Sequence, residues 1–531
     1  AGWDQREAAQ SILKNNLFGL DIDDRAAQLA YFAVMMKARQ YDRRLLTRGI
    51  QPHIYAFAES NTITTAPLHD MGITLSQDEY DTAVKQVLRL LDELRDAKEY
   101  GSILTVTPCD WDLLRRFAVP RTEDEGGQQL LGIHGEQIAA PLLQRLINIG
   151  EALSQQYDVV VTNPPYMGAS GMNARLSQYI KDHFPDTKAD LFACFIERGN
   201  QMAVKHGYNC MVTMQSWMFL SSFEKMREKI LRTKSITNLM HMENMVMGIA
   251  FGTAVTIFRN DHITGYKGTY NQIKLQDIEN GEPKTFPVPE NRFAQTSTDN
   301  FSKIPGSPVA YWVNASILTA YEQGNLIGDS ADVKIGMGTG KNEIFVREWW
   351  EVFYTKIDFS LKTINDLAES KGRYFPYNKG GEFRLWFGNL QEVLWFDTEG
   401  RRYMDTMSGH RENGARDFYC KEGLTWSFIS SSKFGIRYLP TGCFFDVAGS
   451  TLFSRVDNAY TLGFLASCVC FDILGILNPT LNYQAGNIKS LPLLIDREDE
   501  VDERVYQNIQ ISKEDWDSYE NSWDFTRNPL V

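Results

Sequence analysis

The sequence predicts an α/β protein in which a Rossmann-like, doubly wound sheet with a helical insertion precedes a mixed α+β domain. Three observations support this prediction. Short apolar runs alternate with segments rich in helix formers over the first 260 residues, as in repeated β-α-β units. Residues 157–162 are apolar and β-branched, which is typical of a central parallel strand. Beyond residue 310, short aromatic-rich segments are separated by turn residues.

The elements of the first domain are predicted from hydrophobic periodicity and from helix and strand signals. The expected strands lie at residues 17–22, 53–58, 157–162, 210–214, 236–242 and 254–258. The expected helices lie at residues 26–38, 78–97, 142–154, 190–205 and 221–232. Asp190 is expected to cap its helix, and Ser221 with Glu224 has the spacing of a capping box.

The same patterns divide the chain into regions. Residues 1–265 form the predicted sheet domain, with residues 67–150 as a helical insertion between its strands. Residues 266–309 are predicted to be a linker, because Pro, Asn, Gly and Ser are frequent in residues 280–308. Residues 310–492 form the predicted α+β domain, and residues 493–531 form an acidic tail.

The composition is that of a globular protein with a net charge of −13. No run of about 18 or more apolar residues occurs, so no membrane span is expected. The first residues contain neither an initiator Met nor a signal peptide, so we expect the chain to be part of a longer or processed polypeptide. Seven cysteines without a C-x-x-C pair favour free thiols in a reducing cytoplasm over disulfides or structural zinc.

Charge is distributed unevenly along the chain. Residues 496–531 contain eleven Asp or Glu and four Lys or Arg, a local charge of −7. Residues 371–440 contain eleven Lys or Arg and eight Asp or Glu, a local charge of +3. Because DNA binding needs a basic surface stripe and not a basic protein, the negative total does not exclude DNA as a partner.

The tetrapeptide Asn163-Pro164-Pro165-Tyr166 directly follows the expected central strand, at the position where open α/β sheets bind ligands. The Asn163 side-chain carbonyl and the Pro164 backbone carbonyl are two acceptors that the prolines hold in place. Such a pair suits the exocyclic amine of adenine, whose nitrogen becomes nucleophilic when both N–H groups are bound. Tyr166 can stack on an extruded base. A plain Asn-Pro turn is the alternative interpretation.

Acidic residues follow two other expected strands. Asp21, with its neighbour Ile22, ends the first strand, where a carboxylate commonly binds the two hydroxyl groups of a ribose. The next two aspartates are candidates to cap the following helix instead. Glu59 follows the second strand and is a candidate contact for the adenine of a nucleotide cofactor, with Asp110 as the competing assignment.

Residues 19–23 and 163–166, in this order, resemble motifs II and IV of the N6-adenine DNA methyltransferases that depend on S-adenosylmethionine. Residues 188–192 and 216–222 are similar to the next helix and the following turn of that family. The resemblance implies that Asn163, Pro164, Pro165 and Tyr166 are catalytic. It also implies S-adenosylmethionine as the cofactor, with the expected contacts Asp21, Ile22, Glu59 and Asn163, and no metal.

The second half is similar to the PglX family, the adenine methyltransferases of BREX phage-defence systems. Four runs carry this similarity: residues 338–347, 374–381, 426–432 and 477–482. The resemblance, which spans residues 17–492, implies that host DNA is methylated to distinguish it from phage DNA. It also implies double-stranded DNA, other BREX components and phage DNA mimics as partners. The expected DNA contacts are Phe251, Lys341, Asn342, Arg347, Lys379, Arg384 and Arg437.

Two features depart from the family pattern. The Gly-rich motif I, which wraps the methionine part of the cofactor, precedes the acidic strand in the family and is missing from this sequence. PglX proteins are also much longer than this chain. The family carries an aromatic clamp on the strands after residue 240, and Phe251 is the nearest aromatic here, although Met245 and Met247 crowd its register.

Residues 335–340, Ile-Gly-Met-Gly-Thr-Gly, could be mistaken for a cofactor loop placed after the catalytic motif. Such a loop is followed by a helix and, about 20 residues on, by an acidic strand end. Aromatic residues at 349–354 intervene instead, so we predict that the motif order is not permuted.

Three functional hypotheses follow. The first is a DNA adenine methyltransferase. The second is a combined type II restriction-modification enzyme, for which no P-D-x(n)-[DE]-x-K nuclease pattern stands out. The third is a catalytically incomplete DNA-binding fragment, because motif I is missing.

Overall fold

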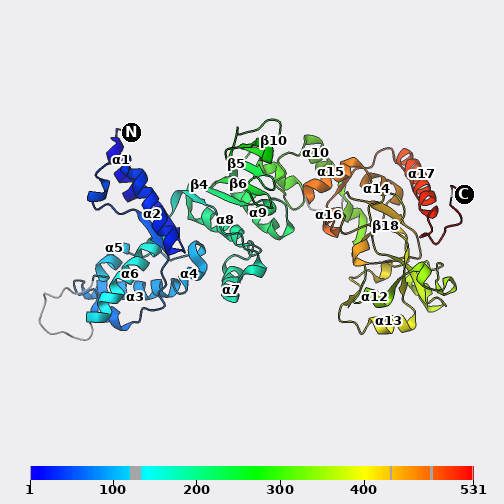
Figure 1. Cartoon of the computed structure of the whole chain (residues 1–531), viewed down its shortest axis with the longest axis horizontal. Helices are drawn as coiled ribbons and strands as arrows, with labels where there is room; N and C mark the ends of the chain where they lie inside the picture. Colours follow the sequence, from blue (N-terminus) through cyan, green and yellow to red (C-terminus); the bar gives the residue numbers. More distant parts are fainter. Residues whose placement is uncertain (1, 120–132, 431–432, 479–481, 529, 531) are drawn as a thin grey trace. The chain divides into compact units, whose positions relative to one another are not determined.

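The computed structural model describes residues 2–119, 133–430, 433–478, 482–528 and 530. The chain forms two compact units, which can be followed by the sequence colours in Figure 1. Unit 1 consists of Ala1–Gln215 and Arg232–Asn291. Unit 2 consists of Ser216–Leu231 and Arg292–Val531. Each unit is therefore assembled from two separate stretches of sequence.

The strands of unit 1 belong to two main sheets. A parallel pair joins β1 to β2, with Asp21 opposite Ala56. A larger sheet contains β7, β5, β6, β4 and β3 in this order. Its β3–β4 and β5–β7 pairs are parallel, and its β4–β6 and β5–β6 pairs are antiparallel. The strand bounds are β1 Phe18–Asp21, β2 His53–Ala56, β3 Tyr157–Thr162, β4 Ala203–Met214, β5 Ser235–Met242, β6 Thr253–Arg259, β7 Lys267–Ile273, β8 Ile278–Glu279 and β9 Glu282–Pro283.

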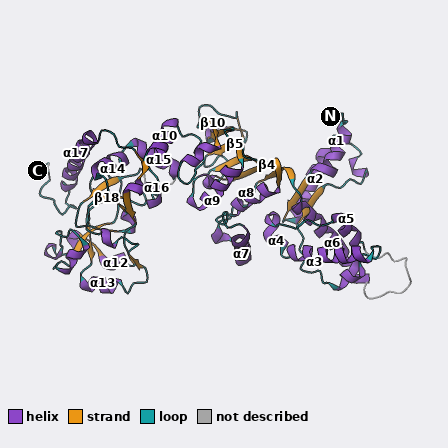
Figure 2. Cartoon of the chain, turned by 180° about the vertical axis from the view of Figure 1, so that it is seen from behind, coloured by secondary structure: helices purple, strands orange, loops and turns teal. Residues whose placement is uncertain are grey.

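The helices of unit 1 pack on these strands and on one another. α2 packs against β1 and β2, and α8 packs against β3 and β4. α3, α5 and α6 form the predicted helical insertion and lie together, as the purple helices of Figure 2 show. The helix bounds are α1 Gln5–Ser11, α2 Asp24–Arg39, α3 Gln77–Glu93, α4 Ala97–Tyr100, α5 Trp111–Phe117, α6 Ile133–Ser154, α7 Ala174–His183 and α8 Leu191–Met202.

The insertion illustrates how local sequence sets these helices. Ser76 caps α3, and the Ser76 backbone N–H donates to Glu79 at 3.0 Å, which completes a capping box. Ala83, Val87 and Leu90 recur at helical spacing and are fully buried. The predicted helix 78–97 is interrupted because Asp96 has a positive φ of 53°, after which α4 begins.

β3 is a strand, as predicted, but the prediction that it lies in the centre of the sheet is wrong. Within the described residues it is the last strand of the larger sheet and pairs only with β4. Val159 and Val161 are 52% and 73% exposed. Because β1 and β2 form a separate sheet, the described residues do not form the single doubly wound sheet that was expected.

Two other predictions require correction. The expected linker 266–309 contains β7, which pairs in parallel with β5, so this segment is part of the sheet. The capping box expected for Ser221 and Glu224 is not formed. A 3₁₀ turn, Ser221–Phe223, comes first, and α9, Glu224–Thr233, follows it without a Ser221 cap.

Unit 2 is mixed α+β, as predicted, with two four-stranded sheets ordered β12-β21-β18-β19 and β14-β16-β15-β20. The strand bounds are β10 Phe293–Ser297, β11 Asn325–Leu326, β12 Ala331–Lys334, β13 Gly338–Thr339, β14 Val346–Glu348, β15 Tyr374–Asn378, β16 Glu392–Trp395, β17 His410–Arg411, β18 Gly423–Trp426, β19 Ile436–Leu439, β20 Phe444–Phe445, β21 Thr451–Ser454 and β22 Pro492–Leu493. The runs 426–432 and 477–482 lie partly outside the described residues.

The core of unit 2 gathers around the fully buried Trp426, Leu452 and Leu462. The predicted acidic tail is not separate from it. Residues 498–517 form α17, which packs on α14 and buries Val505 and Trp516. The helix bounds are α10 Ala315–Gln323, α11 Ile327–Ser330, α12 Asn342–Phe345, α13 Thr398–Met404, α14 Asn458–Leu465, α15 Cys468–Leu477, α16 Ala485–Lys489 and α17 Glu498–Asp517.

The Gly-rich run 335–340 has a packing role in unit 2. A Cβ atom at Gly336 would lie 2.2 Å from the Phe445 carbonyl oxygen, so a side chain does not fit there. Gly338 and Thr339 form β13, which pairs with β17. Among the described residues, no single helix is both long and apolar enough to cross a membrane. Only α14 and α15 together, bent by 69°, reach that length and composition, and both contribute to the buried core.

Candidate active site

The Asn163–Tyr166 turn lies at the carboxyl end of β3. Asn163 is exposed, whereas Pro164 is buried. The Tyr166 hydroxyl shares its proton between two acceptors, Asn163 Oδ1 at 3.2 Å and the Val212 carbonyl oxygen of β4 at 3.1 Å. A carbonyl oxygen has two lone pairs, so Asn163 Oδ1 can accept a further hydrogen bond from a ligand.

Aromatic rings surround the end of this turn. The Tyr166 ring is edge-on to Phe192 of α8, with centroids 6.2 Å apart, and to Phe251, with centroids 5.8 Å apart. The structure therefore brings Phe251, which precedes β6, to the motif. The Tyr166 hydroxyl is a donor in both bonds, and burial raises its pKa above the ordinary value for tyrosine.

Asp190 ties the turn to α8. Its Oδ1 accepts a hydrogen bond from the Met167 backbone N–H at 3.0 Å and another from the Phe192 backbone N–H at 3.3 Å. The predicted cap is confirmed, and its second function was not apparent from the sequence. Asp190 joins the residue after the motif to the start of α8. Burial raises the pKa of this carboxyl group.

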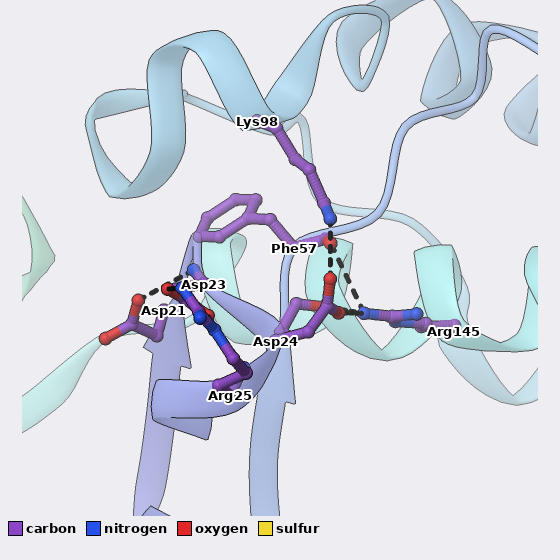
Figure 3. Close-up of polar contacts among 8 residues, drawn as sticks. Asp21, Asp23, Asp24, Arg25, Phe57, Lys98 and Arg145 are labelled. Carbon is purple, nitrogen blue, oxygen red and sulfur yellow. Dashed lines mark hydrogen bonds and ion pairs between the residues drawn. The ribbon is translucent and has the colours of Figure 1, made fainter. Parts of the chain in front are cut away.

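The carboxyl end of β1 carries three aspartates with different partners. Asp23 caps α2 by accepting a hydrogen bond from the Arg25 backbone N–H at 2.8 Å. Asp24 is paired with Lys98 at 2.8 Å and Arg145 at 2.7 Å, and the hydrogen bonds from Lys98 and Arg145 lower the pKa of Asp24. In Figure 3 the Asp21 carboxylate points away from these two cations.

Asp21 is the aspartate best placed to receive a ligand. Its Oδ1 accepts a hydrogen bond from the Asp23 backbone N–H at 2.9 Å. Its Oδ2 has no hydrogen-bond partner among the described side chains and backbone groups. Ile22 follows at the same strand end and is 54% exposed.

The second acidic candidate, Glu59, comes just after β2 and is half-buried. Because β2 pairs in parallel with β1, Asp21 at the end of β1 and Glu59 after the end of β2 belong to the same edge of that sheet. The competing residue, Asp110, caps α5 by accepting a hydrogen bond from the Leu113 backbone N–H at 3.0 Å. Asp110 therefore has a structural role that accounts for its position.

Four of the candidate DNA contacts remain accessible in unit 2. Lys341 and Asn342 are exposed at the start of α12, and Asn342 Oδ1 accepts a hydrogen bond from Thr339 at 2.6 Å. Arg347 and Lys379 are half-buried. Arg347 donates to two backbone carbonyl oxygens, those of Glu343 at 2.8 Å and Val346 at 2.6 Å, which leaves part of its guanidinium available.

The structure contradicts the predicted DNA contact of Arg437 and places Arg384 in contacts within unit 2. Arg437 is 0% exposed on β19 and cannot contact DNA in this conformation, and burial lowers its pKa to about 10. Arg384 forms an ion pair with Asp515 and lies over the ring of Trp516 at 5.1 Å, both on α17. Its charge is therefore balanced within unit 2.

The first half of the chain is similar to a class of restriction-modification methylases. Residues 15–246 match the family model described as Eco57I restriction-modification methylase. This match covers β1, the Asn163–Tyr166 turn and Asp190.

Two curated relatives then define the narrower family. The adenine-specific methyltransferase PglX of Lacticaseibacillus casei (strain Zhang) is 35% identical over all of this chain and 45% of its own length. The adenine-specific methyltransferase BrxX of Escherichia coli O9:H4 (strain HS) is 34% identical over all of this chain and 44% of its own length. Over its whole length the chain is therefore similar to the adenine-specific methyltransferases PglX and BrxX. It spans less than half the length of these relatives.

Solved structures show a weaker similarity. The type IIL restriction-modification enzyme MmeI in complex with DNA has a TM-score of 0.46 and 12% identity, covering 72% of this chain and 52% of that chain. A nuclease-deletion mutant of the type ISP enzyme LlaGI, in complex with a DNA substrate mimic, has a TM-score of 0.42 and 11% identity, covering 96% and 54%. At these TM-scores neither similarity supports a functional argument.

Proposed function

We propose that the protein containing this chain is a site-specific DNA N6-adenine methyltransferase. It transfers a methyl group from S-adenosylmethionine to an adenine swung out of double-stranded DNA. The observation that carries this proposal is the exposed Asn163 side chain beside Tyr166 at the carboxyl end of a parallel strand. Similarity over the whole chain to two adenine-specific methyltransferases supports the same reaction.

The residues of the turn account for activation of the amine. Asn163 Oδ1 and the Pro164 carbonyl oxygen each accept one N–H of the adenine amine, which draws the nitrogen toward tetrahedral geometry. The prolines restrict the backbone, so these acceptors need little reorganisation when the base arrives. Tyr166, held by Val212 and supported by Phe251, stacks on the base, a contact worth about 1–3 kcal/mol in single-strand binders.

The residues present fit the ribose of S-adenosylmethionine. Asp21 Oδ2 is available to accept a hydrogen bond from a ribose hydroxyl, and Ile22 and Glu59 follow neighbouring strand ends. When bound, S-adenosylmethionine supplies an electrophilic methyl group. Asp21 binds, Ile22 packs and Glu59 contacts the adenine of the cofactor, and none of the three transfers a proton.

Unit 2 is proposed to recognise the DNA site, with Lys341, Asn342, Arg347 and Lys379 as contacts to phosphates or base edges. Methylation of host DNA would then distinguish it from phage DNA in a BREX system in the cytoplasm. Other BREX components are the proposed protein partners. Phage proteins with acidic, DNA-like surfaces are proposed to compete for the same surface.

Modification-sensitive sequencing of cellular DNA tests this function. Cells that produce the intact protein should carry N6-methyladenine at one sequence motif, and cells without it should not. Asn163→Ala should abolish the mark while DNA binding, measured by fluorescence anisotropy, is retained. Ser170→Ala is a suitable control, because Ser170 is exposed four residues after the motif. An unchanged level of methylation in the Asn163→Ala variant would overturn the assignment.

A second function applies to residues 1–531 alone. The unpaired edges of β1 and β3 favour a binding fragment that does not turn over by itself. Titration calorimetry of this chain with S-adenosylmethionine distinguishes the two cases. Absence of heat supports the binding fragment, and saturable heat with one equivalent supports a complete cofactor site.

A further inference from the structure

Exposed methionines gather around the Asn163–Tyr166 turn. The chain contains 17 methionines, and four of them are more than a third exposed. One of the four is Met36 on α2. The other three are Met167, which directly follows Tyr166, and Met245 and Met247, which are 51% and 49% exposed in the segment that contains Phe251. Methionine is usually buried because it is apolar, so this grouping indicates a surface that is covered by a partner.

Residues 243–252, here called the methionine loop, connect β5 to β6. β5 runs in the same direction as β3, because β3 is parallel to β4 and both β4 and β5 are antiparallel to β6. The loop therefore leaves the sheet at the edge that carries Asn163. Phe251, near the end of the loop, reaches the Tyr166 ring, with centroids 5.8 Å apart. The loop and the turn are thus neighbouring parts of one surface.

Backbone hydrogen bonds hold the tip of the methionine loop in a defined shape. The Gly248 N–H donates to the Met245 carbonyl oxygen at 2.9 Å, and the Met245 N–H donates to the Ile249 carbonyl oxygen at 2.8 Å. Val246, between the two exposed methionines, packs on the buried cluster at the ends of β5 and β7. A Cβ atom at Gly248 would meet no atom within 4 Å, so the tip stands clear of its surroundings. The loop therefore presents Met245 and Met247 outward from an anchored base.

The composition of the loop fits the base stack of DNA better than the phosphate backbone. Residues 244–252 contain no charged side chain. Phosphates are bound mainly by Lys and Arg, whereas apolar side chains, Met among them, insert between base steps. Methionine also fills irregular gaps, because its side chain is unbranched and flexible. The methionine loop is therefore suited to the space between stacked bases.

We propose that Met245 and Met247 enter the duplex and fill the space that the target adenine leaves when it is swung out. This inference rests on the proposed methyl transfer. While Asn163 and Tyr166 bind the adenine, the two methionines pack on the neighbouring base pairs and on the thymine that has lost its partner. These contacts replace part of the stacking that is lost, so extrusion of the adenine costs less free energy. Phe251 joins the two functions, because it belongs to the loop and contacts Tyr166.

A protein partner is the other occupant that an exposed apolar loop fits. The position of the loop favours DNA. Because the loop and the Asn163–Tyr166 turn share one edge of the sheet and touch through Phe251, a protein that covered the loop would compete with the duplex that must deliver the adenine. The duplex, in contrast, reaches both features at once.

Single-turnover methylation of two DNA duplexes by the intact protein tests the wedge. Both duplexes carry the sequence motif that modification-sensitive sequencing identifies. In one the target adenine is paired with thymine, and in the other it faces an abasic site. An adenine without a pairing partner is extruded at a lower cost, so it depends less on the wedge. We expect Met245→Ala and Met247→Ala each to slow methylation of the paired duplex about tenfold and that of the abasic duplex by about twofold at most.

Matched variants separate the wedge from other effects. Met36→Ala makes the same change at an exposed position of α2 and should leave both rates unchanged. Met247→Leu keeps an apolar side chain of similar size and should retain most of the activity on the paired duplex. Asn163→Ala should be inactive on both duplexes, because it removes an acceptor for the amine. Thermal unfolding of the methionine variants should match that of the parent protein, since these side chains are exposed.

Two results would overturn the wedge and leave the proposed function intact. One is an unchanged rate on the paired duplex in both alanine variants, as expected if the loop binds a protein. The other is equal slowing on the paired and the abasic duplex, because the loop would then act after the base has been extruded. A parent protein that methylates neither duplex would instead remove the proposed function, and this inference with it.

Discussion

At the scale of the residue, Tyr166 illustrates how one hydroxyl group orients a site. The bonds to Asn163 and Val212 hold both the ring and the amide in place. Tyr166→Phe keeps the ring and loses these bonds. We expect methylation by the intact protein to fall about fivefold, since one hydrogen bond contributes about 1 kcal/mol and 1.36 kcal/mol corresponds to a factor of ten.

Initial methylation rates on a DNA duplex measure this effect. Tyr166→Ala should lose more, because the stacking surface is removed as well. Tyr41→Phe serves as the control, since Tyr41 is 48% exposed at the end of α2. An undiminished rate for Tyr166→Phe would show that the hydroxyl does not orient the site.

Glu392 on β16 makes the stability of unit 2 dependent on pH. Burial raises the pKa of Glu392 to about 7, although nearby Lys379 opposes this shift. The folded state therefore binds the proton more tightly than the unfolded chain, and stability falls as pH rises from about 4.5 to about 7. Between pH 5 and pH 8 the parent protein should lose about 1–3 kcal/mol of its free energy of unfolding through this group. The Glu392→Gln variant should not show this loss.

Urea denaturation at the two pH values provides the measurement. Glu343→Gln is the matched control, because Glu343 is exposed on α12. The same pH dependence in the parent chain and in Glu392→Gln would assign the effect to other groups.

At the scale of the element, α17 shows that an acidic segment can be part of a core. Trp516 is 5% exposed and packs with Phe387, Leu439 and Cys443. Trp516→Ala should destabilise unit 2 by about 3–5 kcal/mol, as is usual for truncation of a large buried side chain. It should also make α17 susceptible to proteolysis, measured by limited trypsin digestion and urea denaturation. Tyr519→Ala, 54% exposed, should change neither measurement.

Many helices and strands could be predicted because the signals that define them, such as capping residues and β-branched runs, lie within a few residues of one another. The β-branched run 157–162 is β3, and Asp190 caps α8. Position within the sheet is not a local property, so the sequence placed β3 in the centre and the structure places it at an edge. The sequence also indicated that Ser221 begins a helix, but a 3₁₀ turn competes successfully there.

The difference between local signals and long-range contacts also applies to the candidate site. The Asn163–Tyr166 motif was recognisable because four adjacent residues carry the chemistry. The ion pair of Arg384 could not be predicted because its partner, Asp515, lies 131 residues away in the sequence. Arg437 was misassigned because hydrophobic alternation does not reveal that both faces of β19 are buried.

At the scale of the whole molecule, each unit is built from two stretches of chain. In unit 2 the first of these stretches is a short segment. Residues 216–231 belong to unit 2, although both flanking segments belong to unit 1. Arg227 fixes this segment. It is 1% exposed, and it donates to the Gly306 carbonyl oxygen at 2.7 Å and to the Trp217 carbonyl oxygen at 2.9 Å.

Arg227→Met should therefore weaken unit 2 selectively. The substitution removes the hydrogen bonds that Arg227 donates to the carbonyl oxygens of Gly306 and Trp217, at a cost of about 1–3 kcal/mol for each. Hydrogen exchange should accelerate in β12, β18 and β21, while β4 and β6 of unit 1 keep their protection. Lys225→Met, at an exposed position of the same helix, is the control. Equal acceleration in both units would contradict the division, because the two would then unfold as one cooperative body.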